Sequence, residues 1–314
     1  MNLSISQARV IDPVLTQVAQ GYKHAERVGS MLFPSVPVDV RGGTVLEFSR
    51  ESFRIYAARR APGSSTLQIG FGYEGKPFKL VQDALNSAVP RELLSDAMKV
   101  PKVDMGVRAV NTCMFSLTLT LEAEQAKLAT DANSYATDKK LALSASSQWS
   151  DPSSDPAKDI STAKEVVRLS AGLDPNRMVI SKKGFNALKE HPKIIERFKY
   201  TSSDSITAAM LANLFELDVL AVGKSVALES MEDNAPFVDI WGNSAVLAYV
   251  PAAPSGQEEP SFGYTYTLAG HPMVETPYWD GDRKSYVYGV TYERLPVLTG
   301  IASGFLFQNI VSLS

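Results

Sequence analysis

The stretch NRMVISKKGFNALKEHP, residues 176–192, decides how the C-terminal half of this 314-residue chain folds. Met178–Ser181 is short, apolar and preceded by turn residues, which predicts a buried strand. Lys182–Glu190 has the spacing of a helix, and the His191-Pro192 dipeptide predicts that a new helix starts there, because proline suits the first turn of a helix. The stretch therefore predicts one strand followed by two helices.

The flanking segments continue this pattern in both directions. Upstream, Ile160–Ala171 has helical periodicity, and Gly172 is a suitable C-terminal stop. Downstream, the sequence predicts one further helix and then three strands, at Ile206–Phe215, Asp218–Val222, Phe237–Trp241 and Ala245–Val250. Together these elements predict a compact α/β unit. The turn-rich QWSDPSSDPAKD, residues 148–159, separates that unit from the chain before it.

Residues 104–143 are predicted to form one long helix, although the centre of this segment is ambiguous. FSLTLTL, residues 115–121, alternates like a strand, but residues 122–143 are rich in strong helix formers. When the segment is treated as a helix, one broad face carries its apolar side chains, namely Met114, Leu117, Leu121, Leu128 and Tyr135.

The N-terminal segment, residues 1–36, has too few apolar residues to make a core by itself. Val10, Val14, Leu15 and Val18 have helical spacing, which predicts a short amphipathic helix. Prolines that follow, in LFPSVPV, favour an extended chain. The segment is therefore expected to lie as an arm on another surface.

Residues 38–82 are predicted to form a long β-hairpin with glycine- and serine-rich turns. Gly70, Gly72 and Gly75 match G-x-G-x-x-G, and Gly70 to Lys76 nearly match a phosphate-binding loop. The match fails on context, because Pro77 replaces the hydroxyl residue that would bind magnesium and no helix is predicted to follow. A soluble α/β nucleotide-binding enzyme therefore stays only as an unfavoured alternative.

Two regions of the chain carry opposite charge. Residues 41–79 contain seven Lys or Arg against three acidic residues, a net of +4, whereas residues 225–260 contain six acidic residues and no Lys or Arg, a net of −6. Opposite patches on one subunit suit head-to-tail contacts between identical copies, although a solvated hairpin would explain the basic patch equally well. The candidate interface residues are Arg50, Arg54, Arg59, Arg60, Lys76 and Lys79 on the basic side and Glu229, Glu232, Asp233, Glu258 and Glu259 on the acidic side.

The last fifty residues predict strands. FGYTYTL, from Phe262, is followed by two aromatic runs on either side of Asp280-Gly281-Asp282-Arg283, a turn sequence that indicates a hairpin. GIASGFLFQNIVSL then completes the strand-rich tail.

Composition and motifs give little support to an enzyme. A net charge of −3 does not indicate a nucleic-acid-binding protein, and Cys113, the only cysteine, is expected to be a small buried residue. The three histidines, His24, His191 and His271, lie far apart, follow no metal-binding spacing and are expected in loops or at the surface. The first residues do not have the pattern of a secretory signal, and no apolar run is long enough to predict a membrane span. We therefore predict no catalytic residues, no metal and no cofactor.

The order of these parts resembles the major capsid proteins of tailed bacteriophages with the Hong Kong 97-type fold. The resemblance rests on the layout and on local phrases such as residues 176–192, LDVLAVGKSVAL and FVDIWGNSAVLAYVP. It implies an α+β fold in five parts: an N-terminal arm (1–37), an extended hairpin loop (38–85), a peripheral domain with a long spine helix (86–150), an axial α/β domain (151–262) and return strands of the peripheral domain (263–314).

The resemblance also implies function and partners. Many copies are expected to assemble as pentamers and hexamers into an icosahedral head that encloses double-stranded DNA, in the host cytoplasm, with a scaffolding protein, a portal and a decoration protein as further partners. Because the arm starts at Met1, the scaffold is expected either as a separate protein or as a fused segment that this chain lacks. An encapsulin-like shell is the alternative with the same fold. An isopeptide bond from Lys76 or Lys79 to Asn309 is possible in such a family, but we expect non-covalent closure.

Overall fold

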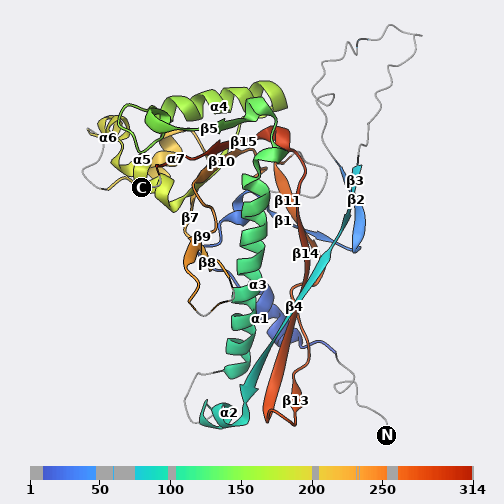
Figure 1. Cartoon of the computed structure of the whole chain (residues 1–314). Helices are drawn as coiled ribbons and strands as arrows, with labels where there is room; N and C mark the ends of the chain where they lie inside the picture. Colours follow the sequence, from blue (N-terminus) through green and yellow to red (C-terminus); the bar gives the residue numbers. More distant parts are fainter. Residues whose placement is uncertain are drawn as a thin grey trace.

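The structure is elongated and is organised around one long helix, α3 (Met105–Thr130), shown in Figure 1. It is a computed structural model that describes residues 10–46, 59, 75–97, 104–199, 205–230, 232, 234–252 and 261–312. A five-stranded sheet with its helices lies at the C-terminal end of α3, and a six-stranded sheet runs alongside the helix (Figure 1). The fold is therefore α+β, as the sequence predicted.

The five-stranded sheet has the order β5-β15-β10-β6-β7. Its strands are Lys140–Ala142, Gly304–Gln308, Ser244–Ala248, Arg177–Ser181 and Val219–Gly223. Central strand β6 is almost wholly buried, as expected for an apolar run without alternation. By strand pairing, β15 belongs to this sheet, because it pairs antiparallel with β10, although the sequence analysis grouped it with the return strands.

Four helices pack around this sheet. They are α4 (Pro156–Ala171), α5 (Lys182–Glu190), α6 (Pro192–Phe198) and α7 (Ala208–Leu214). α4 begins at the N-cap Asp155, whose side chain accepts from Lys158 N, and ends at Gly172, whose φ of 73° is the left-handed conformation that favours glycine. The predicted helices and the Gly172 stop are confirmed within a few residues.

The six-stranded sheet is built on the 14-residue strand β14 (Ser285–Leu298). β4 (Val81–Pro90) pairs with β14 along its whole length, and β11 (Gly263–Leu268) pairs with its C-terminal part. The remaining strands of the sheet are β1 (Ser35–Val38), β12 (Met273–Val274) and β13 (Tyr278–Asp280). β13 and β14 form the hairpin predicted around residues 280–283, and α2 (Arg91–Ala97) follows β4 at the same end.

Helix α3 spans residues 105–130, so the predicted helix over 104–143 was too long. Asp104 caps its start by accepting from Gly106 N and Val107 N, and FSLTLTL is helical despite its alternation. The helix ends because Asp131 adopts an extended conformation and its side chain accepts from Asn133 N. Tyr135 therefore lies beyond the helix, where its hydroxyl donates to Ala129 O, and residues 140–142 form strand β5.

The N-terminal arm packs on this frame, as expected for a segment without its own core. Helix α1 (Pro13–Gly21) is capped by Asp12 and packs against α3 through Leu15 and Ala19. Two two-stranded ladders project from the frame: β2 (Gly42–Leu46) with β3 (Gly75–Lys79), and β8 (Val226–Leu228) with β9 (Phe237–Asp239). The predicted strand over 237–241 is thus shorter and belongs to its own two-stranded ladder.

Candidate assembly surfaces

A buried polar junction joins the N-terminal segment, helix α3 and the β8–β9 hairpin. The Glu122 side chain on α3 is 1% exposed and accepts from Val28 N (3.1 Å), Gly29 N (2.8 Å) and Trp241 Nε1 (2.7 Å). Trp241, which follows β9, is itself 2% exposed. A buried carboxylate is stable only when its oxygens are hydrogen-bonded, and here three donors from two distant segments satisfy it. No pattern in the sequence indicates this junction.

A second contact fixes the start of the β8–β9 hairpin to the arm. Ser225, just before β8, donates from its hydroxyl to Glu26 O (2.7 Å) and accepts from Arg27 Nη1 (2.9 Å). The hairpin itself exposes hydrophobic side chains: Val226 (42%), Leu228 (50%), Phe237 (72%) and Val238 (40%). Large apolar side chains gathered in this way on a protein surface indicate an interaction site.

The β2–β3 hairpin is joined to the six-stranded sheet by different contacts. Arg41, just before β2, binds Glu293 of β14 through two hydrogen bonds of 2.6 and 3.0 Å, and the ring of Phe78 on β3 stacks on Tyr266 at 4.8 Å between centroids. The Arg41 hydrogen bond is the main cause that lowers the pKa of the Glu293 carboxyl, and burial partly opposes it. His271 Nε2 lies 3.9 Å from Glu293 Oε1.

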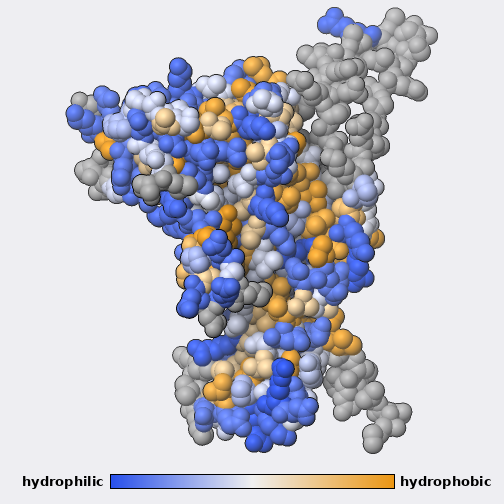
Figure 2. Space-filling view, viewed as in Figure 1, coloured by the Kyte–Doolittle hydropathy of each residue, from blue (hydrophilic) through white to orange (hydrophobic). Residues whose placement is uncertain are grey.

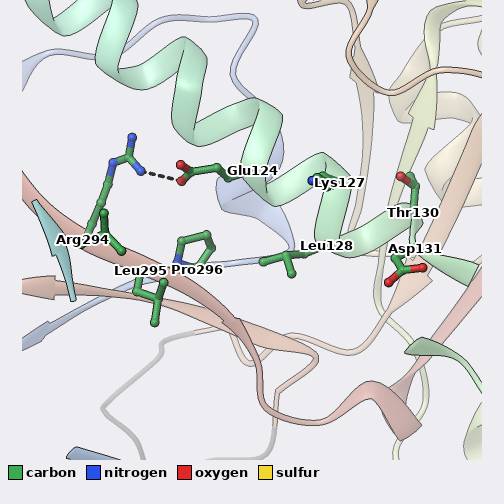
Figure 3. Close-up of a pocket in the computed structure, with 9 residues that line it drawn as sticks. Glu124, Lys127, Leu128, Thr130, Asp131, Arg294, Leu295 and Pro296 are labelled. Atoms are coloured by element: carbon green, nitrogen blue, oxygen red, sulfur yellow. Dashed lines mark hydrogen bonds and ion pairs between the residues drawn. The ribbon is translucent and has the colours of Figure 1, made fainter. Parts of the chain in front are cut away.

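A groove of about 690 Å³ lies between the C-terminal half of α3 and β14 (Figure 3). Its lining residues are Val81, Glu124, Lys127, Leu128, Thr130, Asp131, Arg294, Leu295 and Pro296. The Arg294 side chain is 1% exposed and binds Glu124 (2.8 Å) and Asp83 (3.1 Å). Figure 2 shows hydrophobic residues gathered on this side of α3, over β11 and β14.

An aromatic surface lies at the far end of the six-stranded sheet, remote from the groove. Tyr278 is 53% exposed, and the directly paired Trp279 and Tyr286 are both 42% exposed, with their rings 5.1 Å apart. The other two tryptophans, Trp149 and Trp241, are buried.

The structure describes some of the interface residues predicted from sequence. Lys79 and Arg59 are exposed on the basic side, and Glu229 and Glu232 are exposed on the acidic side. The backbone of Lys76 lies in β3, opposite Val45. The remaining predicted residues lie outside the described residues: Arg50, Arg54, Arg60, Asp233, Glu258 and Glu259. The sequence analysis predicted charged interface residues. It did not predict the exposed apolar face of the β8–β9 hairpin, which lies beside the acidic residues.

The expectations about enzyme chemistry have mixed outcomes. Cys113 is buried as predicted, and burial raises the pKa of its thiol. His191, expected in a loop or at the surface, lies just before α6 but is buried, at 2% exposed. Ser154 Oγ and Asp151 O lie 3.1 and 3.2 Å from its Nε2. Lys76, in the glycine motif, lies in strand β3, which leads into β4 and not into a helix. Among the described residues, no group of three potential metal ligands occurs and no helix could cross a bilayer.

Comparison with known proteins identifies the family. A family model described as phage major capsid protein E matches residues 118–259. The major capsid protein of Burkholderia phage BcepMu is 36% identical over 310 residues, which cover 98% of each chain. This chain belongs to the family of phage major capsid proteins. It is a structural subunit that assembles into the capsid shell.

Solved structures agree with this family and define the fold of the capsid subunit. A phage-related protein from Bordetella bronchiseptica RB50 is similar with a TM-score of 0.84 and 44% identity, covering 97% of this chain and 99% of that one. The putative capsid protein of a prophage of E. coli CFT073 has a TM-score of 0.56 at 13% identity, covering 95% and 99%, which supports the fold alone. The Hong Kong 97-type fold expected from sequence is confirmed, and the encapsulin-like alternative is less well supported.

Proposed function

We propose that capsid subunits contact one another head to tail within a ring, with the β2–β3 side of one copy against the β8–β9 side of the next. The observation that carries this proposal is that the two hairpins lie on opposite sides of α3 (Figure 1). A contact between two different surfaces of identical subunits generates a ring when the rotation closes. Pentamers and hexamers are such rings, and tiling them gives a closed shell.

The described charges support this pairing. Lys79 is exposed on β3, and the side chain of Arg41, at the foot of the same hairpin, is 70% exposed. Glu229 and Glu232 are exposed in the turn between β8 and β9. Complementary charges align partners and disfavour contacts between like surfaces, so they set the direction of the ring. Each contact is weak, but many simultaneous contacts hold a shell together.

The wider role follows from this proposal. We propose a purely structural, non-enzymatic subunit that is assembled in the host cytoplasm, with a scaffolding protein, a portal and possible decoration proteins as partners. Packaged DNA would be contacted through its phosphates without sequence preference. We propose the division into arm, hairpin loop, peripheral domain, axial domain and return strands with the boundaries predicted from sequence, except that β5 and β15 join the five-stranded sheet of the proposed axial domain.

A charge-reversal experiment tests the head-to-tail contact. Lys79→Glu alone, and Glu229→Lys with Glu232→Lys, are each expected to reduce the yield of rings and shells, because each places like charges opposite one another. The variant that combines all three changes is expected to recover assembly. Negative-stain electron microscopy with sedimentation measures the yield of rings and shells. Lys158→Glu, a charge reversal at an exposed position of α4, is the matched control. Normal shells from every variant would overturn the proposed pairing.

A further inference from the structure

We infer that the apolar face of the β8–β9 hairpin inserts into the groove between α3 and β14 of the next copy in the ring. This inference rests on the proposed head-to-tail contact and names the residues that form its core. The face consists of Val226, Leu228 and Phe237, and the groove is the one lined by Val81, Leu128 and Pro296 among others.

The hairpin face has the form of a protruding apolar contact. Leu228 and Phe237 are directly paired across the ladder, and Val226 lies two residues away on the same face. Phe237 is 72% exposed, the highest value among the large exposed hydrophobic side chains of the hairpin. Exposing an aromatic ring of this size costs free energy that burial against a partner would recover.

The hairpin is also held in place before any partner binds. Trp241 and Ser225 attach its two ends to Glu122 and to the arm, and Lys183 Nζ lies 3.2 Å from Asp239 Oδ2 on β9. A contact that is already ordered loses little conformational entropy on binding. A rigid protrusion is therefore better suited to docking than a loop that must first become ordered.

The groove fits this protrusion in size and in character. Its volume of about 690 Å³ falls within the range of ~300–1,000 Å³ typical of pockets that enclose a ligand. Leu128 comes from α3, whereas Leu295 and Pro296 come from β14, so two rigid elements form its walls (Figure 3). Val81, at its edge, is 52% exposed and available for contact.

The hairpin and the groove carry side chains of opposite charge, as the proposed head-to-tail contact requires. Glu229 and Glu232 accompany the hairpin, and Lys127 is exposed on the wall of the groove. Arg294 Nε is buried without a hydrogen-bond partner among the described residues. Glu124 of the groove binds Arg294, and Asp131 accepts from the uncharged donors Asn133 N and Ser134 Oγ. Lys127 is therefore the exposed cation that the groove offers to an acidic partner, because Arg294 is 1% exposed and paired with Glu124 and Asp83.

The occupant is a second copy of this chain because the two surfaces cannot meet within one subunit. The β8–β9 hairpin lies on one side of α3, and β14 lies on the other (Figure 1). Residues 294–296 of β14 line the groove. The family forms shells from many copies, so each subunit has neighbours on both sides. The same contact repeated around a ring would cover every protrusion and fill every groove.

Cysteine crosslinking tests the contact, since the single native cysteine is buried. Leu228→Cys with Leu128→Cys is expected to give a ladder of covalent oligomers on a non-reducing gel after mild oxidation of assembled shells. Leu228→Cys with Leu169→Cys, whose leucine is 68% exposed on α4, is the matched control and should give no ladder. Dimers from Leu228→Cys alone would indicate a symmetric hairpin-to-hairpin contact and would overturn the inference.

A second pair separates this inference from the proposed function. Glu229→Cys with Lys79→Cys reports the charged contact between hairpins. In shells that look normal by electron microscopy, this pair could give a ladder while the groove pair gives none. That result would support the head-to-tail arrangement and would exclude insertion of the hairpin into the groove. The absence of both ladders would contradict both.

Substitution of the exposed ring gives an independent measurement. Phe237→Ser is expected to lower the yield of shells about tenfold or more, as for a buried aromatic at the centre of an interface. Phe237→Leu should restore most of the yield, and circular dichroism should be unchanged for both because the ring is exposed in the subunit. Full assembly of Phe237→Ser would overturn the inference.

Discussion

The two projecting hairpins of this capsid subunit are attached to the frame in different ways. The β8–β9 hairpin is joined to it by the buried junction of Glu122, Trp241 and the arm, whereas the β2–β3 hairpin is joined by the Arg41–Glu293 ion pair and the Phe78–Tyr266 stack. The first attachment excludes water, but the Arg41 side chain is 70% exposed. Ion pairs at such exposure contribute little stability.

This difference indicates distinct mechanical roles for the two hairpins. A hairpin fixed by buried hydrogen bonds keeps its orientation, because moving it would leave buried donors without acceptors. The β2–β3 hairpin is held by an ion pair with one exposed partner and by the ring of Phe78, so its angle depends on fewer buried hydrogen bonds. We therefore expect the β8–β9 hairpin to be the fixed element of the subunit contact and the β2–β3 hairpin to adapt between rings of different size.

Removing the carboxylate of the buried junction should have the largest effect. Glu122→Ala leaves Val28 N, Gly29 N and Trp241 Nε1 without their acceptor, and we expect unfolding free energy to fall by about 3–5 kcal/mol. Glu122→Gln keeps the shape and one carbonyl oxygen, so it should lose less. Urea unfolding of the isolated subunit measures both, and equal stability of Glu122→Ala and the unmodified chain would refute the role of the junction.

Removing the ring that attaches the other hairpin should have a smaller and more local effect. Phe78→Ala deletes a side chain that is 9% exposed and stacks on Tyr266, and we expect a loss of about 3 kcal/mol in the attachment of β3. Hydrogen exchange should therefore accelerate in β2 and β3 while β8 and β9 stay protected. Equal acceleration in both hairpins would contradict their independent attachment.

A matched pair of glycine substitutions sharpens the comparison. A Cβ at Gly223, which ends β7 before the β8–β9 hairpin, would lie 2.3 Å from Trp241 Cδ1, and Gly223→Ala should cost about 1–3 kcal/mol by displacing the buried ring. A Cβ at Gly43 on β2 would meet Phe78 Cε1 at 3.0 Å, where the exposed strand can yield. Gly43→Ala should therefore stay within about 0.5 kcal/mol in thermal unfolding. A larger loss of stability for Gly43→Ala than for Gly223→Ala would show that the Trp241 junction accommodates an added methyl group more easily than the β2–β3 hairpin does.

The smallest expected effect concerns pH. Because the hydrogen bond from Arg41 lowers the pKa of Glu293, the pair stabilises the folded chain fully above the unfolded carboxyl pKa of about 4.3, and this contribution is lost as pH falls through the lower folded pKa. Arg41→Gln should therefore be less stable than the unmodified chain near neutral pH, and the difference should shrink below about pH 4. Stability measured by urea from pH 3 to 7 would reveal this, and a constant difference would exclude the linkage.

Much of the α/β unit around the five-stranded sheet could be predicted from the sequence because its signals are local. The strand at 177–181, the helix at 182–190 and the stop at Gly172 depend on apolar runs, helical spacing and backbone conformation, which neighbouring residues decide. The long helix was predicted to continue to residue 143 because good helix formers continue past Thr130. Residues 140–142 instead pair with β15, more than 160 positions away, and this pairing overrides their helical propensity. A local sequence pattern carries no information about so distant a partner.

The candidate assembly surfaces could be predicted only in part. Charge is visible in composition, so the basic and acidic regions were found. Exposure is a tertiary property, and Phe237 in FVDIW is indistinguishable by pattern from a core strand residue, although it is 72% exposed. The groove could not be predicted because its walls come from three segments far apart in the sequence, residues 81, 124–131 and 294–296.

By itself, the sequence determined the order of most helices and strands and the charge of the two hairpin regions, because composition and short-range periodicity decide these properties. Its layout and local phrases also resembled the capsid family that the comparisons then identified. Only the tertiary structure decided that Glu122 joins three segments, that β15 enters the five-stranded sheet, and that an apolar hairpin and a groove lie on opposite sides of α3. These features arise from contacts between residues far apart in the chain, whose free energy depends on burial and geometry that exist only after folding.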